Sequence, residues 1–235
     1  MARHLILTLE GPLAAYGAEM VDALGPVREW PGASLLTGLL ANALGYTRGM
    51  GAEHARLQTR LRFAVRIDRE RRPMRDFQTA QLAHNDRGWT TRGQPEGRAG
   101  GAATYDSPHI RERHYFADSS VTVALSLDSA GDPPTIETMA SALDHPARPL
   151  FLGRKPCLPS RPLFNGFIDA DDALAAVRIG AAPDCVLIAR DRPGLPDAWE
   201  RLAVTDERDW ISGLHGGERL FRKGRAASLD GEGTA

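Results

Sequence analysis

The most distinctive chemical feature of the sequence is a cluster of arginine side chains. Between residues 56 and 113, thirteen arginines stand against seven acidic residues, a local net charge of +6, whereas the whole chain carries −1. Guanidinium groups bind phosphates through paired N–H donors and stack on unpaired bases. The segment therefore predicts a polyanionic partner such as RNA or DNA, although a solvated, arginine-rich surface would have the same composition.

Polar side chains within and beside this segment are the first candidate contacts. Four arginines near the ends of a glycine-punctuated stretch can bridge phosphates, and three uncharged side chains can pair with base edges. The arginines are Arg75, Arg92, Arg111 and Arg113, and the uncharged residues are Gln78, Thr79 and Gln81. For any one of them a solvated side chain or a polar strand face is as good an interpretation, so the prediction depends on the cluster.

A second candidate is the start of an apolar run that predicts a helix. Gly32, Ala33 and Ser34 are small, and a helix that begins at them would point unpaired backbone N–H groups at an approaching phosphate. Ser34 fits the role of a helix N-cap as well. Because caps and anion sites use the same donors, the two interpretations are compatible.

A third candidate is the turn formed by Gly153, Arg154, Lys155 and Pro156. It places two cations beside a glycine at the end of a predicted strand. Exposed backbone amides and two positive charges together can hold a phosphate. We expect this turn to be a stronger phosphate site than the scattered arginines.

RNA cleavage without a metal is the alternative function. It needs a general base for the 2′-hydroxyl and a cation for the intermediate, and His114, Tyr115 and Lys155 are the residue types that supply them. A histidine in front of a strand is more often structural, so we expect binding without catalysis. No cofactor or metal is expected, because Cys157 and Cys185 are far apart and lack the spacing of a zinc site.

The elements that position these residues follow an alternating order. Strands are predicted at residues 3–10, 61–68, 115–127 and 149–152, and helices at 31–45 and 135–143. This order predicts an α+β, ferredoxin-like antiparallel sheet with two helices over residues 1–163, as in RNA-recognition modules, with a long arm inserted at about 69–113. Residues 164–225 predict a small C-terminal subdomain with a helix near 171–177 and a strand at 185–189, and residues 226–235 a disordered tail.

Composition sets the remaining bounds. With 235 residues, 42% of them hydrophobic, the chain can bury one sizeable core. No stretch approaches the roughly 18 apolar residues of a membrane span, and the first residues lack a signal-peptide pattern. We therefore expect a cytoplasmic protein without a membrane partner.

Five segments, in this order along the chain, resemble the CasD family of type I-E CRISPR Cascade subunits, which belongs to the repeat-associated mysterious protein (RAMP) superfamily. They are Leu9–Gly17 (LEGPLAAYG), Pro31–Gly45, Arg75–Gln81 (RDFQTAQ), Arg113–Asp118 (RHYFAD) and Leu152–Cys157 (LGRKPC). Each is a weak motif by itself, but five in register leave little room for coincidence.

The resemblance implies a non-catalytic subunit for antiviral defence. In this family a ferredoxin-like core with a protruding β-hairpin thumb binds and caps the 5′ handle of the crRNA. The implied neighbours are the CasC backbone subunits and the large CasA subunit, with target DNA reached only through the complex. Guide processing belongs to a separate subunit, CasE, although some relatives in other CRISPR subtypes process pre-crRNA repeats themselves.

The sequence departs from the family pattern at two places. Ala15 and Tyr16 stand where the family usually has Ser-Trp, and Gly32 and Ala33 stand where it often has Thr and a basic residue. The resemblance therefore implies that Tyr16 keeps the aromatic stacking role, whereas a side-chain contact to phosphate at position 33 is lost.

Overall fold

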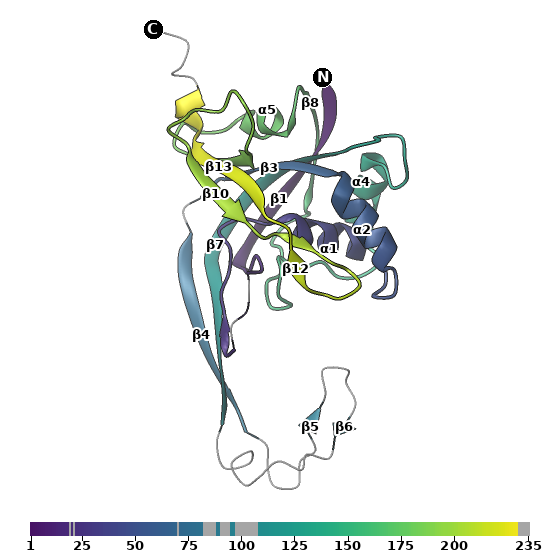
Figure 1. The fold of residues 1–235 in the computed structure, drawn as a ribbon, viewed down its shortest axis with the longest axis vertical. Coiled ribbons are helices and arrows are strands. Elements are labelled where there is room, and N and C mark those ends of the chain that lie inside the picture. Colours follow the sequence, from purple (N-terminus) through teal and green to yellow (C-terminus); the bar gives the residue numbers. More distant parts are fainter. Residues whose placement is uncertain are drawn as a thin grey trace.

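The computed structural model describes residues 1–18, 20, 22–69, 71–81, 88–89, 95–96 and 108–229. Within them, a nine-stranded and mostly antiparallel sheet is covered by helices, and a long hairpin projects from the body (Figure 1). The predicted α+β class with a large antiparallel sheet is confirmed. No helix in this part of the chain is long and apolar enough to cross a membrane.

Nine strands form the sheet, and four helices longer than one turn accompany it in the described part of the chain. The sheet strands are β1 (Ala2–Ala14), β2 (Leu24–Gly25), β3 (Leu61–Ile67), β4 (Arg72–Ala80), β7 (His109–Leu127), β8 (Phe164–Ala170), β9 (Val186–Arg190), β10 (Glu200–Val204) and β13 (Arg219–Arg225). Two short pairs are β5 (Gly88–Trp89) with β6 (Pro95–Glu96) and β11 (Glu207–Arg208) with β12 (His215–Gly216). The helices are α1 (Ala33–Ala43), α2 (Gly51–Arg60), α4 (Ile136–Asp144), α5 (Ala173–Arg178) and a short 3₁₀ turn (Ala226–Leu229).

The centre of the sheet has the strand order β8-β1-β7-β3, and these neighbours are all antiparallel. Helices α1 and α2 connect β1 to β3, and α4 connects β7 to β8. This is the strand order expected of a β-α-β-β-α-β unit. The order is extended at the β3 edge by β9, β13 and β10.

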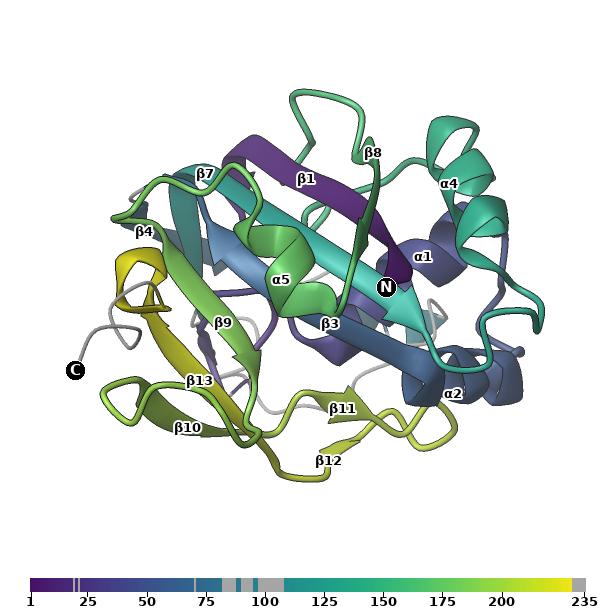
Figure 2. The same cartoon turned by 90° about the horizontal axis from the view of Figure 1, so that it is seen from above.

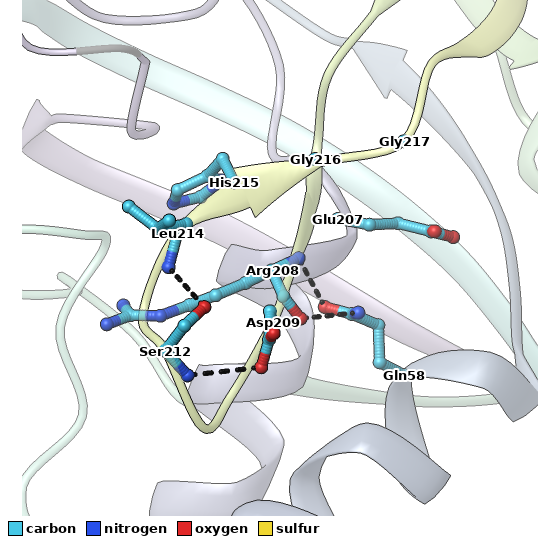
Figure 3. A pocket seen from close by; sticks show the side chains of 9 residues that line it. All are labelled: Gln58, Glu207, Arg208, Asp209, Ser212, Leu214, His215, Gly216 and Gly217. Atoms are coloured by element: carbon cyan, nitrogen blue, oxygen red, sulfur yellow. Dashed lines mark hydrogen bonds between the residues drawn. The ribbon is translucent and has the colours of Figure 1, made fainter.

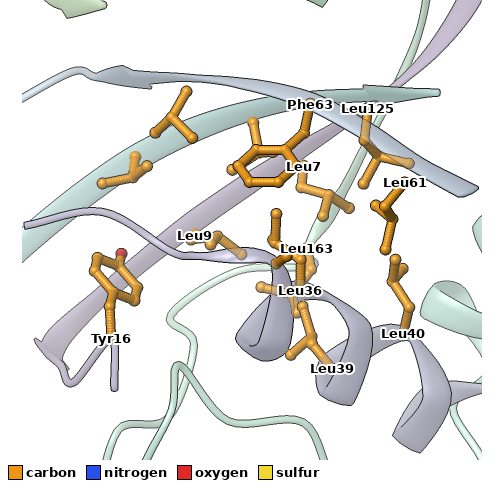
Figure 4. Packing of buried hydrophobic residues seen from close by; sticks show 14 of the residues in the cluster. Leu7, Leu9, Tyr16, Leu36, Leu39, Leu40, Leu61, Phe63, Leu125 and Leu163 are labelled. Atoms are coloured by element: carbon orange, nitrogen blue, oxygen red, sulfur yellow. The ribbon is translucent and has the colours of Figure 1, made fainter. Parts of the chain in front are cut away.

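Successive side chains of the central strands point to opposite faces of the sheet, so the buried residues form two layers. Leu5, Leu7 and Leu9 of β1 face α1, α2 and α4 in the main core, while Ile6 faces the smaller cluster under α5. Figure 4 shows the main core, with leucines of α1 packed against Leu7, Leu9 and Phe63 of the sheet, and Figure 2 shows α5 on the opposite face. The two layers fix which face each strand residue presents.

Two expected elements differ from the structure. Residues 149–152 are not a strand, because Leu152 donates its N–H to the carbonyl of Cys157 at 2.7 Å and accepts from the N–H of Ala15 at 2.9 Å. These bonds close a turn, and the fourth central strand is β8. The helix α2 was not predicted, since its buried face consists of Leu57 together with the polar His54, Gln58 and Arg60.

The expected C-terminal subdomain over residues 164–225 is not separate. Strand β8 pairs with β1, and β9 pairs with β3, so both edges of the central sheet are completed by this part of the chain. The region extends the sheet because its strands supply the hydrogen bonds that the edges of β1 and β3 would otherwise lack.

Candidate RNA interface

The projecting arm is the hairpin of β4 with the first half of β7 (Figure 1). Strand alternation sorts its predicted contact residues onto two faces. Gln78 lies opposite Arg111, and Arg113 lies on the same face two residues further along β7. Arg75 and Thr79 lie on the other face, where Arg75 forms an ion pair with Glu112 at 3.6 Å. The predicted set is therefore divided, and three of its members share one face.

The turn at Gly153 packs against the base of this face and is held there by hydrogen bonds. The Arg154 guanidinium donates to the carbonyl oxygens of His114 at 2.7 Å and Gly25 at 2.8 Å. Its central carbon lies 5.0 Å from the ring centroid of Tyr115. Gly153 has φ of +101°, and a β-carbon there would lie 2.0 Å from the carbonyl oxygen of Ala15, so only glycine fits. The turn thus holds Arg154 beside the arm.

Arg113 and Arg154 form a close pair of like charges. A β-carbon placed on Gly25 would lie 2.9 Å from Nη2 of Arg154 and 3.0 Å from Nη1 of Arg113, so these nitrogens are at most 5.9 Å apart. Nη1 of Arg113 is buried and has no hydrogen-bond partner among the described residues. Asp76, directly across the hairpin, accepts instead from Nε2 of Gln78 at 2.6 Å. Two guanidinium groups at this separation, one with an unused donor, suit a phosphate.

Two further cations flank this Arg113–Arg154 pair. Arg111 is exposed two residues along the same face of β7, and Lys155 is exposed next to Arg154. Within the described part of the chain, Lys155 makes no hydrogen bond or ion pair. The face therefore presents Lys155, Arg154, Arg113 and Arg111 in order from the turn onto the arm, with the carboxylate of Asp76 opposite Arg113.

The backbone N–H groups at the start of α1 already donate hydrogen bonds within the chain. The buried carboxylate of Asp206 accepts from the Ala33 N–H at 2.8 Å, and the Asp206 carbonyl accepts from the Ser34 N–H at 2.9 Å. A β-carbon on Gly32 would lie 2.7 Å from that of Asp206. The expected phosphate site at Gly32, Ala33 and Ser34 is therefore corrected, and the N-cap is Gly32 rather than Ser34.

Tyr16 is also closed to a ligand. Its side chain is fully buried in the main core, and its hydroxyl lies 3.3 Å from Oγ of Ser119. Burial raises the pKa of Tyr16 to about 12. The ring has no exposed face, so the implied stacking on a base does not fit this structure.

The three residues of the nuclease alternative do not converge. His114 and Tyr115 are neighbours in β7 and point to opposite faces of the sheet. Tyr115 is buried under Arg154, Nε2 of His114 is buried without a described partner, and Lys155 is exposed on the turn. A general base, a tyrosine hydroxyl and a cation are thus not brought together around one reacting atom.

The other predicted contacts stand as follows. Gln81 is exposed directly after the end of β4, and Arg92 lies outside the described residues. Sequence reasoning missed Gly25, which β2 places beside Arg113 by pairing with β7 in parallel. A two-residue strand carries no periodic signal, so nothing in the sequence marked it.

A charged cavity at the base of the arm was also missed. It has a volume of about 640 Å³, and its charged lining residues are the cations Arg69, Arg71, Lys223 and Arg225 and the acids Glu29, Asp68 and Asp184. Arg71 lies over the ring of Phe116 at 4.3 Å, and Lys223 forms an ion pair with Glu29 at 2.5 Å. Because two of its cations come from β13, far along the chain, the sequence alone could not assemble it.

Comparison with known proteins gives consistent relatives. A family model described as CRISPR-associated protein (Cas_Cas5) matches residues 4–222. The CRISPR system Cascade subunit CasD of Escherichia coli (strain K12) is 30% identical over 185 residues, 75% of this chain and 76% of the relative.

Two solved structures share the fold. A chain of a CRISPR RNA-guided surveillance complex has a TM-score of 0.69 and 24% identity, covering 94% of this chain and 89% of that one. A chain described as the crystal structure of a Cas protein has a TM-score of 0.60 and 22% identity, covering 95% and 94%. At these identities the likeness concerns the arrangement of the elements.

Proposed function

Because this chain belongs to the CRISPR-associated (Cas_Cas5) family, we propose that it is a non-catalytic subunit of a type I-E Cascade surveillance complex. It binds and caps the 5′ handle of crRNA and helps to assemble the backbone of the complex. Its protein neighbours are CasC and CasA, and it meets target DNA only through the complex, in the cytoplasm.

One observation supports RNA binding most directly, namely the buried, unpaired Nη1 of Arg113 beside Arg154. Leaving a charged donor buried without a partner costs about 1–3 kcal/mol or more. A phosphate oxygen would remove that cost once the half-buried Arg113 side chain turns toward it. The donor lies where the projecting arm meets the body, so a single strand running along the arm would pass it. Arg111 and Lys155 extend the positive face on either side.

The arm also differs between its faces in a way that suits this role. Gln78, Arg111 and Arg113 share the face that meets the Gly153 turn. The other face presents the exposed apolar side chains of Phe77 and Ile110. A basic face can follow an RNA backbone while the apolar face stays free for protein contacts.

Removing Arg113 and Lys155 together is expected to weaken binding of 5′-handle RNA. Hydrogen bonds to charged groups contribute about 1.5–3 kcal/mol, so loss of the Arg113 contact alone lowers affinity about tenfold or more. The slope of log affinity against log salt should fall by about 0.7 for each lost phosphate contact. Fluorescence anisotropy of the Arg113→Ala/Lys155→Ala variant over a salt series measures both.

Arg154 is unsuitable for this test because it also ties the turn to β7 and β2. The matched control is Arg190→Ala, an exposed arginine of β9 without an ion pair among the described residues. Equal losses for the control and the double variant would mean that binding is diffuse. An unchanged affinity and slope in the double variant would remove the Arg113–Arg154 pair from the proposed interface.

Catalysis is expected to be absent. Because His114 and Tyr115 face opposite sides of β7, these two groups cannot act together on one 2′-hydroxyl. We expect the full chain to leave repeat RNA intact in the presence of EDTA, and His114→Ala to change nothing in the product pattern on a sequencing gel. Cleavage in EDTA that His114→Ala abolishes would establish the endoribonuclease alternative instead.

A further inference from the structure

The hairpin β11–β12 ends in a loop, residues 209–214, that presents two aliphatic side chains to solvent. Ile211 is 89% exposed and Leu214 is 70% exposed, more than any other large hydrophobic residue in the described part of the chain except Met1. Single exposed hydrophobic residues are common on protein surfaces. Whether this pair can bind a partner therefore depends on the residues around it.

The loop is held in one conformation by its own hydrogen bonds. Oδ1 of Asp209 accepts from the N–H groups of Ile211 at 2.8 Å and Ser212 at 3.2 Å, and the Leu214 carbonyl accepts from the Asp209 N–H at 2.9 Å. The Gly213 N–H donates to the Asp209 carbonyl at 2.8 Å. Figure 3 shows the bond from the Ser212 N–H to the Asp209 carboxylate. The backbone that carries the two aliphatic side chains is thus ordered before any partner binds, which lowers the entropy cost of binding.

Planar side chains fasten this loop to the helical layer. The ring of Trp210 stacks on that of His54 at 4.6 Å, and the ring of Tyr46 meets His54 edge-on at 5.5 Å. Nε1 of Trp210 donates to Oε1 of Gln58 at 3.1 Å, and the guanidinium of Arg208 lies 5.3 Å from the Trp210 ring centroid. Since Trp210 is already engaged by the chain itself, it is poorly placed to stack on a nucleobase.

A cavity of about 490 Å³ beside the loop is cationic. Its lining includes Tyr46, Arg48, His54, Arg208, Trp210 and Ile211, and no carboxylate among the described residues lines it. Arg48 is exposed and makes no ion pair within the described part of the chain. Nε of Arg208 is buried without a hydrogen-bond partner there, and in Figure 3 its guanidinium points away from Gln58. A partner that fills this cavity should supply negative charge.

We propose that loop 209–214 and this cavity form a docking surface for a protein partner. The partner offers an apolar recess to Ile211 and Leu214, and next to it acidic side chains that reach Arg48 and Arg208. Half-buried Trp210, Tyr46 and Arg208 around exposed aliphatic anchors match the residue types that are enriched in interface hot spots. The identity of the partner rests on the function proposed above, in which the neighbours are CasC and CasA.

The test uses the full chain co-expressed with tagged CasC, CasA and guide RNA. The Ile211→Asp/Leu214→Asp variant places negative charge and removes the anchors, so its retention in the complex should fall at least about tenfold. Arg48→Glu should also lower retention, and the loss should shrink as salt is raised, because a rim charge acts through screened electrostatics. Ile179→Asp is the matched control, with an exposed isoleucine (56%) just after α5, and should assemble normally.

Melting temperatures of the isolated variants show whether they fold. Should the double aspartate variant melt early, Ile211→Ser and Leu214→Ser, which add no charge, take its place. Normal retention of a folded double variant, or equal loss in Ile179→Asp, overturns the proposal. So does an Arg48→Glu variant that assembles fully but loses affinity for RNA, because the surface would then bind nucleic acid. The two proposals can fail separately. If assembly depends on Ile211 and Leu214 but the chain has no affinity for handle RNA, the docking surface stands and the RNA-binding proposal is overturned.

Discussion

Replacing Asp206 with alanine is expected to lower the free energy of unfolding by about 3–5 kcal/mol, because removing one partner of a buried ion pair leaves the other charge uncompensated. Asp206 is 1% exposed, and Oδ1 and Oδ2 accept from Nε and Nη2 of Arg219, whose side chain is 7% exposed, at 2.7 and 2.5 Å. The same carboxylate accepts from the first N–H of α1. The substitution therefore leaves the buried guanidinium with only the half-exposed Glu207, 3.6 Å from Nη1, and uncaps a helix at once.

Urea unfolding followed by circular dichroism measures this effect. The control is Asp128→Ala, which removes the half-exposed partner of Arg62 and should cost no more than about 1 kcal/mol. Asp206→Asn keeps an acceptor for the Ala33 N–H but not the charge, so its loss should lie between the two. A cost below about 1 kcal/mol for Asp206→Ala would mean that water replaces the carboxylate in solution.

Replacing Gly153 with alanine should have the second large effect. A residue other than glycine in a positive-φ conformation costs about 1–3 kcal/mol, and the added carbon would also overlap the Ala15 carbonyl, so the total should reach at least about 3 kcal/mol. The turn must move to avoid this contact, and Arg154 moves with it. Urea unfolding should therefore show lower stability, and handle RNA should bind more weakly.

Gly166→Ala separates the two causes. Gly166 has a similar φ of +97°, but nothing lies within 4 Å of an added β-carbon. This variant should lose only the backbone contribution, about 1–3 kcal/mol, and keep its RNA affinity. Equal losses in both variants would show that the approach of Ala15 to Gly153 is relaxed in solution.

Much of the fold could be predicted because burial leaves a periodic pattern. The strands β1, β3 and the second half of β7 are buried over most of their length, and one face of each carries the large apolar residues that pack in the main core. The first half of β7, from His109 to His114, has no such pattern because both of its faces lie outside the core. Its hairpin could be expected only through the resemblance to the CasD family, which the family match confirms.

The candidate site was predicted less well because its determinants are distant in sequence. Arg113, Arg154 and Lys155 follow local signals of charge and turn, and the structure brings them together at the base of the arm. The start of α1 carried an equally good local signal. The prediction of a phosphate site there was wrong because Asp206, which lies 173 residues beyond Ala33, accepts hydrogen bonds from the same backbone N–H groups. Local chemistry identifies what a group can bind, whereas long-range contacts decide whether it is free.

The position of β9 in the sheet has a consequence for synthesis. Strand β3 is synthesised early, yet its outer edge pairs with β9, which follows more than a hundred residues later. The N-terminus of α1 is capped only after Asp206, still further along the chain, has been synthesised. During that interval the nascent chain exposes an unpaired, largely apolar strand edge, the kind of surface that recruits other chains. A pause in translation before β9 would thus favour aggregation, and rapid synthesis or a bound chaperone would favour the native sheet.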